Sequence, residues 1–375
     1  MDMLETALPL AEITIIKRDF DLLRKLVLNL TPDVQTQIVP YSALFCYEAI
    51  SYLKKYDPSI TIEQTSNYSI KDIRQKAKFF DLSVSKLINS VDNVDAMQHE
   101  YFINLMKNPQ LGYWNIHTNL GIYYDHNKHI VGNTHYAYYI FQDEKSISQP
   151  QPEIKNLELE GKEIQAFGYD MGVIIGNISS ALSETSDFME SDVLAKGNDY
   201  LSQDFNTNRC TTTNNEKYKL VRLFMLHILS SIGFIIYAIK PRIIRDTGLL
   251  LRLEYITYHY ALKRLDGILR YCKTNHSEIS DPNLIQMLES IDCSNSNNLR
   301  KTDFRNCMMH FQLENKEGSS LISEEHFNLS LPFCGLVETQ FGLSYNEYQK
   351  LIESELNSLY NVLNQYLGFE SLLTV

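Results

Sequence analysis

A run of 17 residues without a formally charged side chain, residues 223–239, limits what this chain can fold into more than any other feature. As a helix it would be about 25 Å long at 1.5 Å per residue, against roughly 30 Å of hydrocarbon in a membrane. The run also contains His227 and Ser230, and Pro241 follows it closely. We therefore expect a central helix that is buried on all sides, in a protein with no membrane partner.

The rest of the chain favours a mainly α-helical fold, because apolar residues recur at helical spacing in many segments. Helices are predicted over residues 12–30, 41–56, 69–91, 169–188, 216–239, 248–273 and 283–291, from near Thr302, and over 344–367. The last helix has the clearest ends, since Ser344 and Glu347 predict a capping box and Gly368 a stop. The C-terminal half is thus predicted to be an antiparallel helical bundle.

One segment, residues 112–141, has the composition of β-strands. It is rich in Tyr, Ile, Val and Thr, with turn residues at 125–128 and 132–133, and predicts a small meander or hairpin. The polar residues 143–163 predict one more hairpin or only a linker, and residues 203–215 predict a polar loop.

These patterns divide the chain into an N-terminal helical region over 1–110, a small β-rich insertion or linker over 111–166, and a helical bundle over 167–375. A hydrophobic fraction of 44% with 21% charged residues is typical of a soluble globular protein. The six cysteines are scattered without a CxxC pair, which favours a reducing compartment. The N-terminus has acidic residues where a secretory signal has basic ones, so we expect a cytoplasmic protein.

One short motif stands out in the predicted bundle, the R-N-x-x-x-H arrangement of Arg305, Asn306 and His310. Four Arg-x(4–6)-His pairs occur in the chain, and only this one has Asn directly after Arg. On a helix, Asn306 and His310 share a face, whereas Arg305 and His310 lie about 140° apart around the axis. One straight helix therefore does not point Arg305 and His310 at a single atom, although two copies of the chain would allow it.

The motif resembles that of the HEPN (higher eukaryote and prokaryote nucleotide-binding) superfamily, whose members are helical bundles carrying R-x(4–6)-H. The resemblance covers the motif and the order of helices over about 216–369, and does not reach the first 200 residues. It implies a metal-independent endoribonuclease that works as a homodimer, with the two motifs facing each other across a cleft. It also suggests a toxin or anti-phage defence effector, with an antitoxin or regulatory protein as partner.

The residue types fit RNA cleavage without a metal or a cofactor. The 2′-hydroxyl attacks the neighbouring phosphate, so the enzyme moves protons and stabilises phosphoryl charge. We assign acid–base catalysis to His310, phosphate stabilisation to Arg305, and the positioning of His310 or of the backbone to Asn306. Two alternatives stay open: a surface helix whose His and Arg face solvent, and a non-catalytic HEPN-like module that dimerises or binds a partner or a nucleotide.

The net charge of −12 opposes RNA binding, but the charge is unevenly distributed. Residues 216–275 hold eleven basic and four acidic residues, a net charge of +7. This window predicts a local RNA track or only a solvated helix face.

Two other groups of residues have functional and structural readings. His117, Asp125, His126, His129 and His135 are alternative metal ligands or turn residues. Tyr255, Tyr258 and Tyr260, with His259, are expected to pack in the core or to stack on bases.

Overall fold

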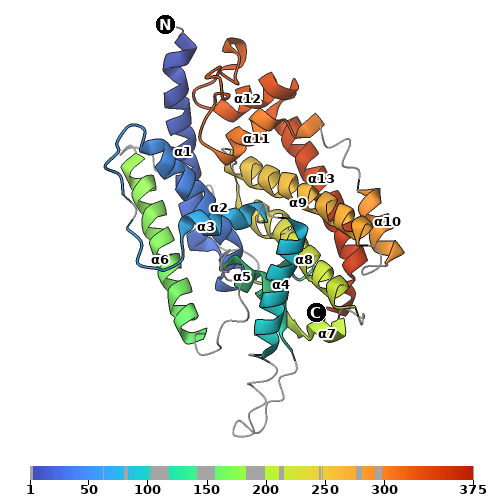
Figure 1. Ribbon diagram of the computed structural model, residues 1–375. Coiled ribbons are helices and arrows are strands. Elements are labelled where there is room, and N and C mark those ends of the chain that lie inside the picture. The colour runs from blue at the N-terminus through green and yellow to red at the C-terminus, as the bar shows by residue number, and fades with distance from the viewer. Residues whose placement is uncertain are drawn as a thin grey trace.

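The computed structural model shows a mainly helical protein with a small three-stranded antiparallel sheet (Figure 1). It describes residues 3–61, 63–79, 83–100, 102, 118–141, 157–182, 199–210, 215–244, 246, 248–275, 281–291 and 298–374. The prediction of a mainly α-helical fold is confirmed.

The N-terminal region is helical, as expected. Its elements are α1 (Met3–Asn29), α2 (Pro32–Leu53), α3 (Ile70–Ile73), a 3₁₀ turn (Arg74–Lys78) and α4 (Val84–Gln98). The single helix predicted over 69–91 is wrong, because the 3₁₀ turn ends at Phe79, whose φ of +47° is left-handed. Phe79 is buried edge-to-face on Phe224 of the central helix, and this packing is available only where the chain turns.

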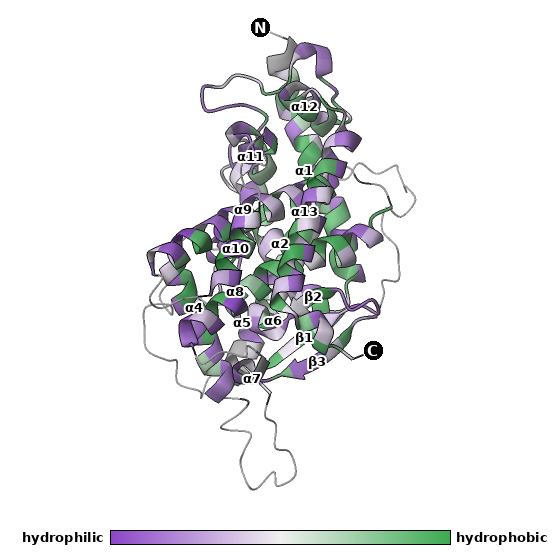
Figure 2. Cartoon of the chain, turned by 90° about the vertical axis from the view of Figure 1, so that its right-hand side faces the viewer, coloured by the Kyte–Doolittle hydropathy of each residue, from purple (hydrophilic) through white to green (hydrophobic). Residues whose placement is uncertain are grey.

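The strands form a sheet in the order β2-β1-β3, next to the C-terminus (Figure 2). Strands β1 (Leu120–Tyr124) and β2 (Ile130–Asn133) form the expected hairpin. The extension of this strand segment to 141 is wrong, because α5 (Thr134–Ile140) begins where the Asn133 side chain accepts a bond from Tyr136 N. The third strand, β3 (Leu201–Phe205), overlaps the predicted polar loop, and its five residues all pair with β1.

The helix α6 (Leu157–Leu182) begins inside the segment predicted as a hairpin or linker, so that prediction is wrong for residues 157–163. The helix packs along α1 and α2 at one side of the molecule (Figure 1). Asp170 fixes α6 to the loop between α2 and α3, because its carboxylate accepts hydrogen bonds from the backbone N–H groups of Thr65 and Ser66. A short helix, α7 (Thr207–Cys210), follows β3.

The uncharged run forms the centre of the molecule, as predicted. It lies in α8 (Glu216–Gly233), which continues as a π-helical turn (Phe234–Ile239) and a 3₁₀ turn (Lys240–Arg242). Among the described helices, this segment is the one long and apolar enough to cross a membrane, yet 94% of its most apolar window is buried inside the protein. Such burial is that of a core helix in a soluble protein.

The C-terminal part of the chain is helical, and its last long helix packs against the central helix α8. It comprises α9 (Leu249–Thr274), α10 (Pro282–Ser290), α11 (Thr302–Met309), a 3₁₀ turn (Glu324–His326), α12 (Pro332–Phe341), α13 (Tyr345–Leu367) and a last 3₁₀ turn (Phe369–Leu372). The capping box of Ser344 and Glu347 is confirmed, and Gly368 ends α13 with a φ of +71°. Helices α8, α9 and α13 pack against one another.

The N-terminal and C-terminal helices share one core, because buried apolar residues form a single cluster from Leu8 to Leu373. A buried ion pair marks where they meet: Arg252 of α9 donates to Asp19 of α1, and both are at most 1% exposed. The guanidinium carbon of Arg252 lies between two rings, 4.4 Å from the centroid of Phe45 and 4.2 Å from that of Phe311. Helices α1, α2 and α9 and the end of α11 are thereby joined.

Candidate functional site

His310 is held by a buried carboxylate from the far end of the sequence. Its Nδ1 lies 2.6 Å from Oε2 of Glu48, which is on α2. The side chain of His310 is 42% exposed, whereas that of Glu48 is only 8% exposed. The imidazole is therefore reachable from solvent while the group that orients it is shielded.

Glu48 is itself fixed from its other oxygen. Oε1 accepts a bond from Nη1 of Arg74 at 2.7 Å, and the guanidinium of Arg74 lies 3.9 Å from the ring centroid of Tyr47. The Arg74–Glu48–His310 chain thus places one permanent positive charge behind the carboxylate. With both oxygens engaged, Glu48 has little freedom to rotate away from the imidazole.

This arrangement determines which nitrogen of His310 can do chemistry. A carboxylate only accepts hydrogen bonds, so Nδ1 carries the proton that Glu48 receives. Nε2 of the neutral ring is then the acceptor, and it becomes a donor when the ring is protonated. A carboxylate on Nδ1 also stabilises the imidazolium that forms when the ring takes up a proton.

His310 lies just beyond α11, so the predicted helical face shared by Asn306 and His310 is not formed. The backbone at His310 is extended, with φ of −117° and ψ of 162°. The change follows from packing, since Phe311 and Leu313 alternate as buried residues after the helix. With this extended backbone at His310, its ring points toward Glu48 on α2.

The side chains of the other two motif residues bond to each other instead of to the His310 ring. Nη2 of Arg305 donates to Oδ1 of Asn306 at 2.7 Å, and the Asn306 backbone carbonyl accepts from His310 N–H at 2.8 Å. Burial raises the pKa of Tyr255 on α9, and the charges of Arg300 and Arg305 oppose that rise. Within the described part of the chain, no hydrogen bond or ion pair joins Arg305 to His310.

Sequence reasoning missed Glu48 and Arg74. Each lies in an ordinary helical segment, and Glu48 is 262 residues from His310, so no local spacing links them. The usable signal was chemical: a histidine proposed as a base calls for an orienting carboxylate, but the chain has many acidic residues.

Five basic residues of the window over 216–275 are engaged within the protein. They contact acids or backbone carbonyls: Lys219 with Asp95, Arg222 with the Leu367 carbonyl, Lys240 with Glu353, Arg242 with the Ala238 carbonyl, and Arg252 with Asp19. Arg245 lies outside the described residues. Lys263, Arg264 and Arg270, in the C-terminal half of α9, line a groove, so the local RNA track and the solvated helix face both stay open as predictions.

The alternative metal ligands do not converge. His129 donates to or accepts from Asp125 at 2.9 Å and stacks on Tyr237 at 3.8 Å, and His117 lies outside the described residues. Among the residues that the structure describes, no group of three or more His, Cys, Asp or Glu side chains is placed to hold a metal ion.

The tyrosines of α9 are part of the core. Tyr255, Tyr258 and Tyr260 are each at most 4% exposed, which confirms the packing alternative over base stacking.

A buried histidine pair lies beneath α4. Nδ1 of His135 is 2.9 Å from Nε2 of His227, and Nε2 of His135 is 4.0 Å from the carboxylate of Asp95. Burial lowers the pKa of His135 to about 4 and holds the pKa of His227 well below its usual range. Both rings are thus neutral at pH 7, and the N–H of one ring donates to the unprotonated nitrogen of the other, which suits a structural role.

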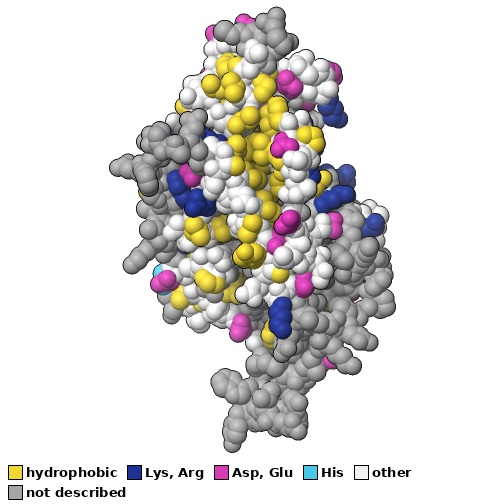
Figure 3. All heavy atoms as spheres, turned by 90° about the vertical axis from the view of Figure 1, so that its left-hand side faces the viewer, with side chains coloured by type: hydrophobic (Ala, Val, Ile, Leu, Met, Phe, Trp, Pro, Cys, Tyr) yellow, Lys and Arg dark blue, Asp and Glu magenta, His cyan; other side chains and the backbone are white. Residues whose placement is uncertain are grey.

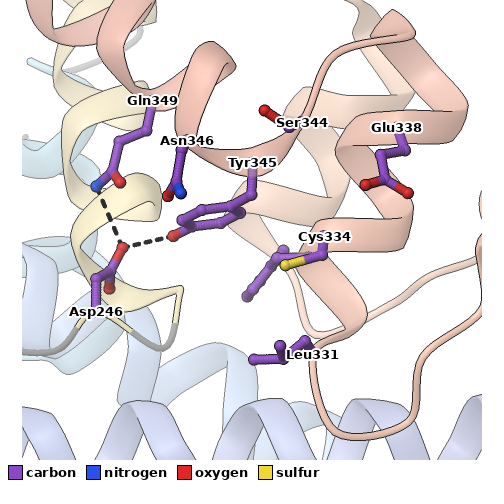
Figure 4. Close-up of a pocket in the computed structure, with 9 residues that line it drawn as sticks. Asp246, Leu331, Cys334, Glu338, Ser344, Tyr345, Asn346 and Gln349 are labelled. Atoms are coloured by element: carbon purple, nitrogen blue, oxygen red, sulfur yellow. Dashed lines mark hydrogen bonds between the residues drawn. The ribbon is translucent and has the colours of Figure 1, made fainter.

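A pocket of about 520 Å³ lies between the start of α9 and helices α12 and α13 (Figure 4). Tyr345 and Gln349 both donate to Asp246, whose other oxygen accepts from the N–H groups of Gly248 and Leu250 at the start of α9. Behind it, burial together with Asp246 raises the pKa of Glu254 to about 8. Both oxygens of Asp246 already accept hydrogen bonds from within the protein, so we do not place the reaction in this pocket.

Comparison with known protein families, with curated proteins and with solved structures finds no match to this chain. Function must therefore be argued from the site itself.

Proposed function

We propose that this protein is a metal-independent endoribonuclease in which His310 is the general acid–base residue. The observation that carries the proposal is the half-exposed His310 imidazole, held at Nδ1 by buried Glu48 at 2.6 Å. The R-N-x-x-x-H resemblance to the HEPN superfamily supports the same residue from the sequence side.

The chemistry requires one site that both takes and gives a proton. Nε2 of neutral His310 accepts the proton of the attacking 2′-hydroxyl, and the resulting imidazolium is stabilised by Glu48. The 2′-oxygen bonds to phosphorus as the bond from phosphorus to the 5′-oxygen breaks, and the His310 imidazolium returns its Nε2 proton to the leaving 5′-oxygen. The products are a 2′,3′-cyclic phosphate and a free 5′-hydroxyl. Proton transfer of this kind contributes about 10²- to 10⁴-fold to a rate.

The proposal assigns stabilisation of the charge on the phosphoryl oxygens to Arg305 of a second copy of the chain. Within one chain Arg305 bonds Asn306 while His310 bonds Glu48. A two-fold axis would allow the Arg305 of one protomer to approach the His310 of its partner, with Asn306 orienting the guanidinium. A homodimer is therefore part of the proposal, as are a cytoplasmic location, a toxin or defence role, and an antitoxin or regulatory protein as partner.

The test is cleavage of single-stranded RNA by the purified full-length protein in excess EDTA. We expect products with 2′,3′-cyclic phosphate ends, and a loss of at least about 10²-fold in rate for His310→Ala. His326→Ala is the matched control, since His326 is also a partly exposed histidine and contacts only Ser323 and Thr339 among the described side chains. A wild-type protein that does not cut, or a His310→Ala variant that cuts at the wild-type rate, would refute the proposal.

The alternative, a non-catalytic dimerisation or partner-binding module, is favoured by the outward face of α6. Gly168, Gly172 and Gly176 recur every four residues, and no atom lies within 4 Å of a Cβ built on any of them. Tyr169 and Val173 on the same helix are exposed, and Figure 3 shows a stripe of apolar side chains along the face that carries α1 and α6. Such a face permits close approach of a second helix.

The two candidates differ in one measurement. A module without catalysis predicts no RNA cleavage under any condition and a dimer that Gly172→Lys dissociates, as measured by light scattering. The nuclease predicts cleavage that depends on His310.

A further inference from the structure

A basic groove of about 430 Å³ lies between the start of α4 and the C-terminal half of α9. Three of its lining residues are cationic, namely Lys263, Arg264 and Arg270, and four carry hydroxyl groups, namely Ser83, Ser85, Tyr271 and Thr274. Among the described residues that line it, none is acidic. The groove is therefore a concave surface of one charge sign in a protein whose net charge is −12.

The cations of the groove differ in how firmly they are held. Arg264 lines the groove but is only 4% exposed, so little of its side chain is open to solvent. Arg270 is 73% exposed in its side chain and pairs with Asp266 at 2.7 Å. An exposed ion pair four residues apart on a helix is weak, so an anion in the groove can compete with Asp266 for Arg270.

The start of α4 adds hydrogen-bond donors to the groove. Ser83 is the N-cap residue, but its side chain makes no capping bond, and its hydroxyl lies 3.2 Å from that of Ser85. The first N–H groups of a helix lack intrahelical partners and carry partial positive charge. Gly267 lets α4 sit this close, because a Cβ there would be 3.0 Å from Val84 Cγ2.

We propose that this groove binds a phosphate group. The cationic side chains, the hydroxyls of Ser83 and Ser85 and the N-terminus of α4 suit a tetrahedral anion with several acceptor oxygens. The phosphate could belong to an RNA strand or to a free nucleotide, and these two sources share the chemistry.

The groove is separate from the proposed nuclease site, so the inference does not rest on the nuclease proposal. Arg252 donates to the Met308 carbonyl at the end of α11, and Arg264 is twelve residues further along α9. At 1.5 Å per residue these two positions are about 18 Å apart along the helix.

The experiment measures binding without cleavage. A fluorescein-labelled single strand of 2′-O-methyl RNA, which has no free 2′-hydroxyl, is titrated with the full-length protein and followed by fluorescence anisotropy. A Lys263→Ala/Arg270→Ala double variant should bind at least about tenfold more weakly, with a salt dependence reduced by one to two phosphate contacts.

Lys273→Ala is the matched control for this double variant. Lys273 is on the same helix, is half exposed and pairs with Glu289 at 2.7 Å, but it does not line the groove. We expect its affinity to stay within about twofold of wild type, as a surface charge outside the site would.

Ser85→Asp provides a second variant that should fold at least as well as wild type. An acidic residue in the first turn of a helix is favourable, so the melting temperature should not fall. The added negative charge should nevertheless weaken binding at least about tenfold.

Competition distinguishes the two sources of phosphate. Displacement of the labelled strand by unlabelled RNA, but not by equal phosphate concentrations of ATP, assigns the groove to a strand, whereas equal displacement by ATP assigns it to a nucleotide. The proposal is wrong if the wild-type protein does not bind the labelled strand. It is also wrong if the affinities of the double variant and of Ser85→Asp for that strand lie within twofold of the affinity of Lys273→Ala.

Discussion

The imidazole Nδ1 of His310 lies 2.6 Å from the carboxylate Oε2 of Glu48, across a separation of 262 residues. This contact joins the end of α11 to α2 and leaves Nε2 of His310 as the nitrogen available to a substrate. Arg74 holds the other oxygen of Glu48, so the orientation of His310 depends on three elements far apart in the sequence.

We predict that Glu48→Gln lowers kcat for RNA cleavage about 10- to 10³-fold and leaves KM within twofold. The amide has no charge to stabilise the imidazolium, and its single carbonyl oxygen cannot accept from both Arg74 and His310, so its NH₂ group faces one of these two donors. Steady-state kinetics in EDTA provide the measurement. Glu12→Gln is the control, because Glu12 is also a buried carboxylate but accepts from Tyr52 and from Leu313 N–H. Equal effects of the two substitutions would remove Glu48 from the mechanism.

We predict that Glu254→Gln stabilises the protein in a pH-dependent way. Burial and the nearby Asp246 raise the pKa of Glu254 from 4.5 to about 8. A raised folded-state pKa contributes stability that is full below pH 4.5 and is lost as the pH rises to about 8. The neutral glutamine avoids this loss, so the variant should gain on the order of 2 kcal/mol over wild type at pH 8.5 and little at pH 4.5. Urea denaturation at the two pH values tests this, and an equal gain at both would contradict it.

We predict that the buried histidine pair makes the protein sensitive to acid. The pKa of His135 is lowered from 6.5 to about 4 by burial, and that of His227 is lowered as well. Stability from such groups is present above pH 6.5 and is lost as the pH falls toward 4, because the unfolded chain takes up protons that the fold excludes. For each histidine, the free energy of unfolding should fall by about 2 kcal/mol between pH 6.5 and pH 5.

His227→Gln isolates this effect. At pH 7.5 the variant should be less stable than wild type, because it loses the 2.9 Å bond to His135. Its decline in unfolding free energy between pH 7.5 and 5, measured by urea denaturation, should be smaller by about 2 kcal/mol. Parallel declines for the two proteins would show that His227 is not the group that titrates.

We predict that Asp19 and Arg252 are strongly coupled in their contributions to the free energy of unfolding. Arg252→Met should cost about 3–5 kcal/mol, since it leaves the Asp19 carboxylate buried without its partner. The double variant Asp19→Asn/Arg252→Met should recover part of that loss, because no charge is then left unpaired. A double-mutant cycle from urea denaturation should give a coupling above about 1 kcal/mol, whereas additive effects would argue against the pair.

Part of the fold could be predicted from local sequence. The uncharged residues 223–239 required burial, because a helix without charged positions has no face suited to water, and the structure buries them around α8. The ends of α13 followed from Ser344, Glu347 and Gly368, since a capping box and a left-handed glycine act within one turn. The β1–β2 hairpin likewise follows from its own turn residues.

Tertiary structure decided what depends on distant partners. Strand β3 has little apolar pattern of its own and forms because β1 offers it a pairing edge, and the helix predicted over 69–91 stops at Phe79 because that ring is buried on Phe224. The same holds for the site. Sequence alone singled out Arg305, Asn306 and His310, but packing separated Arg305 from His310 and supplied Glu48, because side-chain contacts between distant segments depend on the folded core and leave no spacing in the sequence.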